Sequence, residues 1–447
     1  MDSKRGQWST KIGFILSSAG AAIGLGAIWK MPYVTGQSGG GAFFLLFVIF
    51  TLLIGLPMLI SEFIIGRGTG AEAISAYKKL APKSVWVWIG RLGVAGCFLL
   101  LSFYSVVGGW ILIYSGKAVV GNVIQSGTAP DQLFGMITGT PWITLVGLAL
   151  FTLINVLIIS LGVQNGIEKA NKYMMPLLFV FFFILVIRAL SLEGAMEGVK
   201  FFLAPDFSKI TGKAVLYALG QSFFALAVGF SCMVTYSSYL KKDESLPNSA
   251  GSVVLMNIFV SLLAGLAIFP VVFAFGFEPA EGPGLLFMVL PSVFSQMPFG
   301  ELFLAIFLLL FLFATLTSSF SLYEIIVAAF VEKWPNARRN IAFALGVVVF
   351  IAAIPAALSS SSLSDFTIFD KSIFDATDYL VSNIMLPLGN LLIAIFIMHK
   401  VKKSFVKAEF MQGGKLSPVY FNTWKFLMTW VVPIIITIVF VYSIFQY

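Results

Sequence analysis

The chain has 447 residues, of which 59% are hydrophobic and only 11% charged, with a net charge of +8. Soluble globular domains carry about 25% charged residues, so this composition excludes an ordinary soluble domain. The positive charge forms no basic patch with interleaved aromatic residues, and no nucleic-acid partner is expected. We expect one membrane domain over residues 1–447, in contact with the lipid bilayer.

Apolar segments recur along the whole chain. A helix needs roughly 20 mostly apolar residues to cross a bilayer. In chain order, the segments that meet this length cover residues 12–34, 42–66, 88–116, 142–160, 168–190, 214–240, 249–277, 299–330, 341–358, 376–398 and 424–446. The sequence therefore predicts an all-α integral membrane protein with eleven transmembrane helices.

The lysine and arginine residues predict the orientation, because cytoplasmic loops carry an excess of both. If the N-terminus lies inside, most of the 28 fall in inner loops. The exceptions are Lys30 within the first segment and, outside, Lys117, Arg188, Lys200, Lys209, Lys213 and Lys371. We expect a multi-pass plasma-membrane protein with a cytoplasmic N-terminus and an extracellular C-terminus.

Two of the segments contain residues that a continuous membrane helix should avoid. The first reads SAGAAIGLGAIWKMP, with Gly24, Gly26 and Pro32. The sixth reads GQSFFALAVGFS, with Gly229 and Ser231 in mid-membrane. Such glycines can mark helix packing. They can also mark unwound backbone, which a membrane tolerates only where it is buried in protein or lines a cavity.

These and other segments resemble the neurotransmitter:sodium symporter family. The resemblance rests on residues 8–32 and on the runs GQSGGGAFF (36–44), SEFIIGRG (61–68), GIEKANKYMMP (166–176), GQSFFALAVGF (220–230) and FATLTSSFSLYE (313–324). It covers nearly the whole chain and looks closest to bacterial amino-acid members, which implies a bacterial inner membrane.

The resemblance implies the LeuT-like fold, a 5+5 inverted repeat with discontinuous helices 1 and 6. The two repeats would cover residues 12–190 and 214–398, followed by an extra helix at 424–446. Interrupted helices in corresponding positions of two repeats point to the binding site of a transporter.

The resemblance also implies sodium sites. The second site of the family would use Gly20, Ile23, Ala314, Thr317 and Ser318. Carbonyl and hydroxyl oxygens suit a hard cation, although a Thr-Ser pair in a helix can also bond back to a preceding carbonyl.

The first sodium site would use Ala22, Ala225 and Asn257 together with the substrate carboxylate. Many members have an Asn where this chain has Ala27 and a Thr or Ser where it has Ala225, so two side-chain oxygens are missing. We therefore expect one or two sodium ions. Chloride dependence stays open, because the corresponding residues fit neither the chloride-dependent nor the chloride-independent pattern: Phe47, Gln221, Ala225 and Ser261.

The substrate is expected to be a neutral amino acid. Gly24 replaces the Asp of family members that carry monoamines, which leaves room for a substrate carboxylate beside the Tyr104 hydroxyl. A charged substrate side chain would meet no counter-charge, which is costly in an apolar site. The expected substrate-binding residues are Ala21, Ala22, Gly24, Gly26, Leu100, Tyr104, Phe224, Ala227, Phe230, Ser319, Ser321 and Leu322.

Two pairs match the gates of the family. Lys30 and Asp378 would form the outer gate, and Arg5 with Glu332, beside Trp8, the inner one. Ordinary snorkelling of these side chains at the membrane surface is the alternative interpretation.

Two acidic residues lie deep in the predicted spans. Glu62 is expected to bond to the broken helices. Glu324 stays open between a proton-coupled site and a satisfied residue of the inner vestibule.

Together these features predict a sodium-coupled symporter that imports a hydrophobic aliphatic or aromatic amino acid by alternating access. An enzyme is not expected, because the one histidine, His399, lies at the inner edge of a span and no P-loop or nucleophile motif is present. The alternatives are a symporter of another small carboxylate-bearing solute and an ion channel. The particular amino acid and the oligomeric state stay open.

Overall fold

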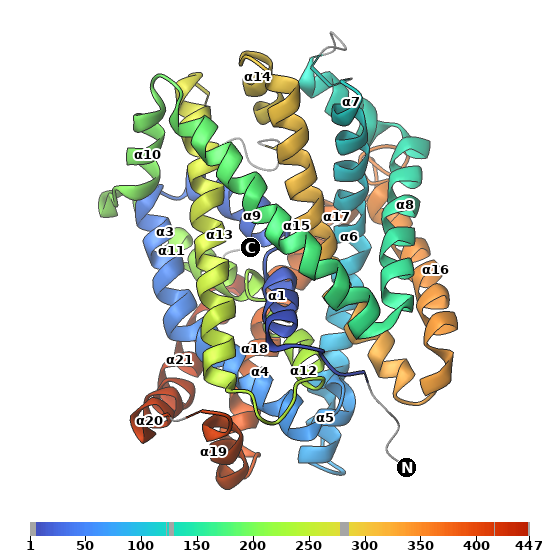
Figure 1. Cartoon of the computed structure of the whole chain (residues 1–447), viewed down its shortest axis with the longest axis vertical. Coiled ribbons are helices and arrows are strands. Elements are labelled where there is room, and N and C mark those ends of the chain that lie inside the picture. The colour runs from blue at the N-terminus through green and yellow to red at the C-terminus, as the bar shows by residue number, and fades with distance from the viewer. Residues whose placement is uncertain (1–5, 122, 125–128, 278–285, 415, 446–447) are drawn as a thin grey trace.

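The computed structural model describes residues 6–121, 123–124, 129–277, 286–414 and 416–445. The helices run along the long axis of the molecule (Figure 1). We call the end that carries α5 and α19 the lower end, and the end that carries α10 and α14 the upper end. The N-terminal segment lies at the lower end (Figure 1).

The first half of the chain contains five long helical segments and several short ones. Their bounds are α1 Lys11–Ala22, η1 Gly26–Lys30 and α2 Met31–Gln37; α3 Gly41–Phe50, η2 Thr51–Gly55 and α4 Leu56–Thr69; α5 Ala73–Leu80; α6 Val87–Val119; α7 Pro130–Gly139; α8 Pro141–Ser160; η3 Val163–Glu168 and α9 Lys169–Leu190; and α10 Ala195–Leu203.

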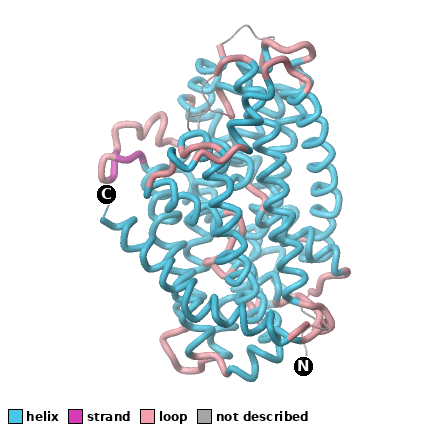
Figure 2. Tube along the Cα trace, turned by 90° about the vertical axis from the view of Figure 1, so that its left-hand side faces the viewer, coloured by secondary structure: helices cyan, strands magenta, loops and turns pink. Residues whose placement is uncertain are grey.

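The second half begins with η4 Phe207–Lys209 and ends with a long apolar helix. Its elements are α11 Gly212–Phe224; α12 Cys232–Ser237; α13 Leu246–Ala274; α14 Val289–Ser295; α15 Gly300–Val331; η6 Pro335–Ala337 and α16 Arg338–Ala357; β1 Thr367–Ile368 and β2 Lys371–Ser372; α17 Ile373–Tyr379, η7 Leu380–Met385 and α18 Leu386–His399; α19 Lys403–Met411; and α20 Pro418–Phe426, η8 Leu427–Val431 and α21 Val432–Phe445. The two strands form one antiparallel hairpin that projects from the helical body (Figure 2).

Both predicted helix breaks are present. Helix 1 consists of α1 and the segment Gly26–Gln37, which meet at an angle of 51°. Helix 6 consists of α11 and α12, and the predicted span 214–240 is interrupted at residues 225–231. Within this break Ala227, Gly229 and Ser231 have positive φ angles of 51°, 103° and 59°, which interrupt the α-helical hydrogen-bond pattern.

The described residues contain nine helices long and apolar enough to cross a membrane, and a tenth crossing if the bent pair of helix 1 counts as one. The two short halves of helix 6 are not among them. The fold class is therefore confirmed as all-α and membrane-spanning, while the number of eleven and the division into repeats at 12–190 and 214–398 stay predictions.

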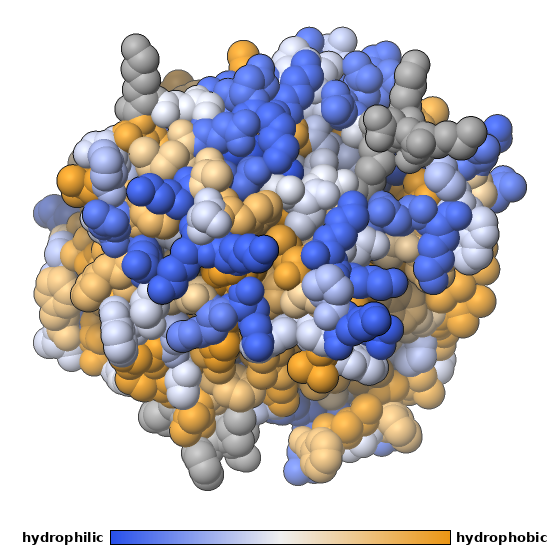
Figure 3. Space-filling model, turned by 90° about the horizontal axis from the view of Figure 1, so that it is seen from below, coloured by the Kyte–Doolittle hydropathy of each residue, from blue (hydrophilic) through white to orange (hydrophobic). Residues whose placement is uncertain are grey.

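The outside of the bundle is apolar where lipid would lie. Large apolar side chains of α8, α9 and α16 are exposed, among them Leu150, Phe183 and Ile351. Such extensive exposure is unusual for a soluble protein and is typical of a membrane surface. On the lower face, hydrophilic residues gather over the middle and reach the upper edge of the view, and hydrophobic ones lie mainly along its left and lower edges (Figure 3).

The two breaks meet inside the bundle. The N-terminal half of helix 1 packs against α9, α13 and α15, and α15 packs along α6. Figure 1 shows α1 between these longer helices. The unwound residues 23–25 and 225–231 are therefore surrounded by protein, as the polar backbone of a broken membrane helix requires.

Candidate functional site

The break of helix 6 is held by a buried acid. The Glu62 carboxylate, fully buried on α4, accepts hydrogen bonds from the backbone N–H groups of Gly229 at 2.7 Å, Met233 at 3.1 Å and Val234 at 3.3 Å. These donors lie in the unwound segment and the first turn of α12, where no helical carbonyl is available to them. The expectation that Glu62 bonds to a broken helix agrees with this geometry.

Side-chain donors from neighbouring helices satisfy carbonyl groups at both breaks. Gln221 Nε2 donates to the Gly26 carbonyl at 2.6 Å, and Asn257 Nδ2 donates to the Ala225 carbonyl at 2.7 Å. Ser318 Oγ donates to the carbonyl of Ala21 at 2.9 Å. The unwound backbone is thus fixed by specific hydrogen bonds.

A cavity of about 30 Å³ lies between the two breaks. This is close to the volume that one molecule occupies in liquid water, about 30 Å³. Its lining residues are Ala21, Ala22, Gly24, Gly26, Leu100, Tyr104, Phe224, Ala227, Phe230, Cys232, Ser318, Leu322 and Leu386. All the expected substrate-binding residues except Ser319 and Ser321 are in this lining.

The two exceptions point elsewhere. The Ser319 hydroxyl bonds to the amide oxygen of Asn155 and to the carbonyl of Leu316, and the Ser321 hydroxyl donates to the carbonyl of Ser318. Both hydroxyls therefore lie behind the cavity wall. Three lining residues were not expected at the substrate site: Cys232, Ser318 and Leu386. Ser318 was expected only at the second sodium site, and neither Cys nor Leu carries a signal for a binding site.

Gly24 and Tyr104 form the polar side of the cavity. A Cβ atom on Gly24 would lie 2.5 Å from Ser318 Oγ and 2.7 Å from the Tyr104 hydroxyl, so any other residue would collide with them. The Tyr104 hydroxyl accepts from the Leu25 N–H and donates to the Thr315 carbonyl, both at 3.4 Å. Such long hydrogen bonds are weak, and the hydroxyl can exchange them for a ligand.

Gly20, Ala314 and Thr317, three of the residues expected at the second sodium site, lie together. A Cβ atom on Gly20 would be 3.1 Å from Thr317 Cβ, so α15 passes directly beside the last turn of α1. The Thr317 hydroxyl donates to the Ala314 carbonyl at 3.1 Å. A hydroxyl that donates its proton to a carbonyl keeps its lone pairs for a cation. These oxygens fit a hard cation in chemical type.

Among the residues expected at the first sodium site, one side-chain oxygen is free. Asn257 is fully buried, and its Oδ1 has no hydrogen-bond partner although its Nδ2 is bonded to Ala225. The nearby Ser261 hydroxyl on the same helix is also buried without a partner. Ala22 and Ala225 are buried and contribute only backbone oxygens.

At the upper end, Lys30 Nζ lies 3.8 Å from Asp378 Oδ1. The same ammonium group lies 5.2 Å from the centre of the Phe224 ring, which lines the cavity. The structure therefore brings together the two residues expected at the outer gate and places Phe224 between them and the cavity. Their role as a gate stays a prediction.

At the lower end, Trp8 closes the bundle. Its side chain is 2% exposed, its indole N–H donates to the Tyr236 carbonyl at 2.9 Å, and its backbone N–H donates to the Tyr239 carbonyl at 3.2 Å. Next to it, the Glu168 carboxylate accepts hydrogen bonds from the Ser9 backbone and hydroxyl. The chain before α1 is therefore attached to α12 and to the start of α9.

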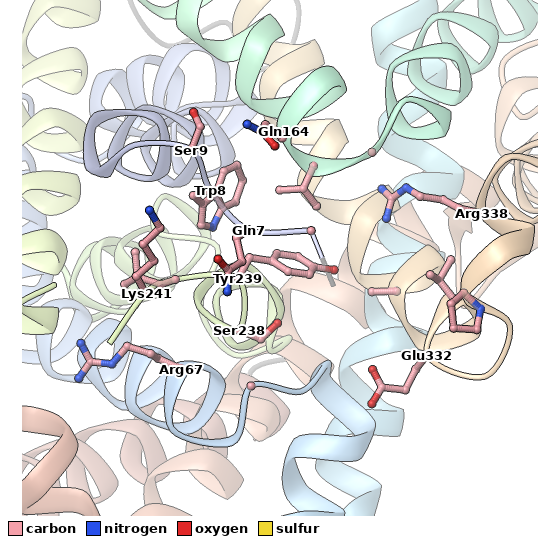
Figure 4. A pocket seen from close by; sticks show the side chains of 18 of the residues that line it. Gln7, Trp8, Ser9, Arg67, Gln164, Ser238, Tyr239, Lys241, Glu332 and Arg338 are labelled. Carbon is pink, nitrogen blue, oxygen red and sulfur yellow. The ribbon is translucent and has the colours of Figure 1, made fainter. Parts of the chain in front are cut away.

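A vestibule of about 1440 Å³ opens below Trp8. Figure 4 shows Trp8, Gln7 and Tyr239 in the middle of its lining, with Arg338 and Glu332 on one side. Arg5, the expected partner of Glu332, lies outside the described residues.

Glu324 has a cationic partner that the sequence did not reveal. Its buried carboxylate accepts two hydrogen bonds from the Arg338 guanidinium and one from the Tyr239 hydroxyl at 2.8 Å. The pair joins α15 to the start of α16, and Tyr239 follows α12. This geometry favours the satisfied vestibule residue over the proton-coupled site for Glu324.

The chain matches a family model described as the sodium:neurotransmitter symporter family over residues 5–124 and 139–447. The uncharacterized sodium-dependent transporter YhdH of Bacillus subtilis is 52% identical, and the match covers 98% of each chain. A sodium-dependent transporter of Haemophilus influenzae is 39% identical over 99% of each chain. The human sodium- and chloride-dependent GABA transporter 2 is 26% identical over 99% of this chain and 81% of its own.

Among solved structures, the chain is similar to the crystal structure of MhsT in complex with L-phenylalanine. The TM-score is 0.91 and the identity 39%, over 98% of this chain and 100% of the other. The architecture is thus that of the LeuT fold, with helices 1 and 6 broken. The chain belongs to the sodium:neurotransmitter symporter family, whose members are sodium-dependent transporters rather than enzymes.

Proposed function

We propose that this protein imports a neutral, hydrophobic amino acid together with sodium. The observation that carries the proposal is the cavity between the two helix breaks, which is apolar apart from Tyr104, Ser318 and unwound backbone. The N–H groups of the second half of helix 1 would face the substrate carboxylate, where a helix N-terminus favours an anion. The phenylalanine named with the structure of MhsT belongs to the same class of solute.

The side-chain end of the cavity explains the preference for an apolar substrate. Leu100, Phe224, Phe230, Leu322 and Leu386 offer no charge and no hydrogen-bonding group. A charged substrate side chain would lose its hydration there without compensation. The cavity must widen to admit an amino acid, and flexible leucine and phenylalanine side chains can move to allow this.

One or two sodium ions would drive the uptake. Site 2 comprises Gly20, Ile23, Ala314, Thr317 and Ser318, and site 1 depends on Asn257 Oδ1 and the substrate carboxylate. A tenfold sodium gradient supplies about 1.4 kcal/mol per ion, and 100 mV adds about 2.3 kcal/mol per charge. One ion therefore suffices for an accumulation of a few hundredfold.

Alternating access would proceed by opening the two ends in turn. Lys30, Asp378 and Phe224 close the upper path, and Trp8 with the Glu324–Arg338 pair closes the lower one. Helices 1, 2, 6 and 7 would rock against helices 3, 4, 8 and 9. The lower end, where hydrophilic residues gather over the face, would be cytoplasmic, in line with the loop charges (Figure 3).

Uptake into proteoliposomes tests the proposal. Labelled phenylalanine, leucine and γ-aminobutyrate are offered under an inward sodium gradient, with choline replacing sodium as the control and gluconate replacing chloride to decide chloride dependence. We expect sodium-stimulated uptake of the first two, and its loss in Thr317→Ala but not in Thr51→Val. No sodium-stimulated uptake of any neutral amino acid, or a steady ion current, would contradict the proposal.

A further inference from the structure

Asn171, in the first turn of α9, is a buried amide without a partner. Its side chain is fully buried, and neither Oδ1 nor Nδ2 has a hydrogen-bond partner. Among the buried asparagines that the structure describes, Asn155, Asn257 and Asn390 each use their Nδ2 in a hydrogen bond, so Asn171 alone leaves both ends of its amide unpaired. Buried polar groups nearly always bond to protein, water or an ion. The amide of Asn171 therefore calls for a polar partner that is not a protein side chain.

The amide oxygen points at the end of α1. Asn171 Oδ1 lies 2.8 Å from the position that a Cβ atom on Gly20 would take. The same position is 3.1 Å from Thr317 Cβ and 3.3 Å from Met175 Sδ. Oδ1 thus lies at the junction of three helices, α1, α9 and α15, which pack against one another.

Glycine at position 20 is what makes this approach possible. A side chain at this position would meet Asn171 Oδ1 at 2.8 Å, so the amide would have to turn away from α1. The Cβ position of Gly20 thus faces both Asn171 of α9 and Thr317 of α15. Gly20 and Thr317 are two of the residues of the second sodium site in the proposed function.

We propose that Asn171 supplies a further side-chain oxygen to sodium at the second site, from α9. The inference rests on the proposed function and deepens it. An amide oxygen is a suitable ligand for a hard cation. Its neighbours Gly20 and Thr317 supply a backbone carbonyl and a hydroxyl, so sodium there would draw its oxygens from three helices. The ion then holds α9 against α1 and α15, and the Asn171 amide has the partner that it lacks in the protein alone.

Sodium-dependent thermal stability of the purified protein, without substrate, tests the role of Asn171. The midpoint of thermal unfolding is recorded as sodium replaces choline at constant ionic strength, and the half-saturating sodium concentration is taken from the shift. Asn171→Leu removes both polar atoms at nearly constant volume. Loss of an outer-shell partner already costs about tenfold in the affinity for a metal, and loss of a direct ligand should cost at least as much. We therefore expect the half-saturating sodium concentration to rise by about tenfold or more.

Two further variants separate sodium binding from mere packing. Thr51→Val removes another buried hydroxyl without a partner, and its half-saturating sodium concentration is expected to match that of the unchanged chain. Asn171→Asp keeps the oxygen and adds a negative charge, so its half-saturating concentration is expected to fall. An unchanged sodium dependence in Asn171→Leu, with a higher midpoint in choline, would overturn the inference.

The remaining outcomes are also decisive. If Asn171→Leu does not fold, Asn171→Ser takes its place, because the shorter side chain cannot reach the site. Equal sodium dependence in Asn171→Ser, Asn171→Asp and the unchanged chain then overturns the inference. If the unchanged chain itself shows no sodium-dependent shift, the proposed function fails and this inference with it.

Discussion

Cys97 on α6 and Cys232 at the start of α12 face each other, with their Sγ atoms 3.3 Å apart. On the proposed mechanism these two helices move relative to one another, and Cys232 also lines the cavity. A disulfide requires an S–S distance of about 2.05 Å, so an approach of roughly one ångström suffices.

We therefore expect a mild oxidant, copper phenanthroline in air, to join the two thiols and to stop uptake. Dithiothreitol should restore it. The cross-link is measured as a mass loss of about two hydrogens in the peptide pair, independently of transport. Cys97→Ser, which keeps a single thiol, should transport before and after oxidation. Full cross-linking with unchanged uptake would show that α6 and α12 do not move apart.

Breaking the lower ion pair should cost stability. Glu324→Gln leaves the Arg338 guanidinium partly buried without its carboxylate, and such a loss typically costs about 3–5 kcal/mol. We expect a clearly lower midpoint of thermal unfolding. The double variant Glu324→Gln/Arg338→Gln removes both charges and should recover part of the loss. If the double variant lost as much stability as the two single variants together, Glu324 and Arg338 would not stabilise each other directly.

Breaking the ion pair at the upper end should have a much smaller effect than breaking the lower one. Lys30 and Asp378 are 27% and 35% exposed, and exposed ion pairs contribute about 0–1 kcal/mol. Lys30→Gln is therefore expected to speed the release of bound labelled substrate by no more than about fivefold, whereas Lys30→Arg should slow it or leave it unchanged. Lys209→Gln, which breaks the exposed pair with Asp206, is the control and should have no effect. A loss of all binding in Lys30→Gln would mean that the lysine contacts the substrate.

Glu62 should be essential for the shape of helix 6. Glu62→Gln replaces one acceptor oxygen by an N–H₂ group that faces backbone donors, and an unsatisfied buried donor costs about 1–3 kcal/mol. We expect a lower unfolding midpoint and weaker substrate binding together, measured by thermal unfolding and equilibrium binding. Glu193→Gln, at an exposed acid, should change neither. If Glu62→Gln lowered the unfolding midpoint but bound substrate normally, substrate binding would not depend on the shape of the helix 6 break.

The membrane spans and both helix breaks could be predicted because they depend on local composition. Runs of apolar residues and the glycines around Gly24 and Gly229 are visible in any short window. The extent of helix 6 was wrong, because α12 ends at Ser237 rather than residue 240. Its end depends on turns after Ser237 that no hydrophobic pattern marks.

The partners of charged groups could not be predicted in the same way. Glu168 bonds to Ser9 and Arg338 to Glu324, contacts that depend on how helices pack. Asn171 stood inside a recognised motif, yet its unpaired amide becomes visible only when α1 and α15 are seen around it. Most residues that line the cavity between the breaks were expected from the motifs, whereas Cys232 and Leu386 were not and Ser318 was expected only at a sodium site; their role in binding substrate stays a prediction.

The cavity between the breaks has a volume of only about 30 Å³, so on the proposed function the binding site must adapt its shape to each substrate. A solute can enter only if Phe224, Phe230 and the leucines that line the cavity change their packing. Each such change costs free energy and lowers the affinity for the solute. The affinity for each apolar amino acid would then depend on how far these side chains can move aside. Amino acids of similar size should therefore bind with affinities that change gradually with size.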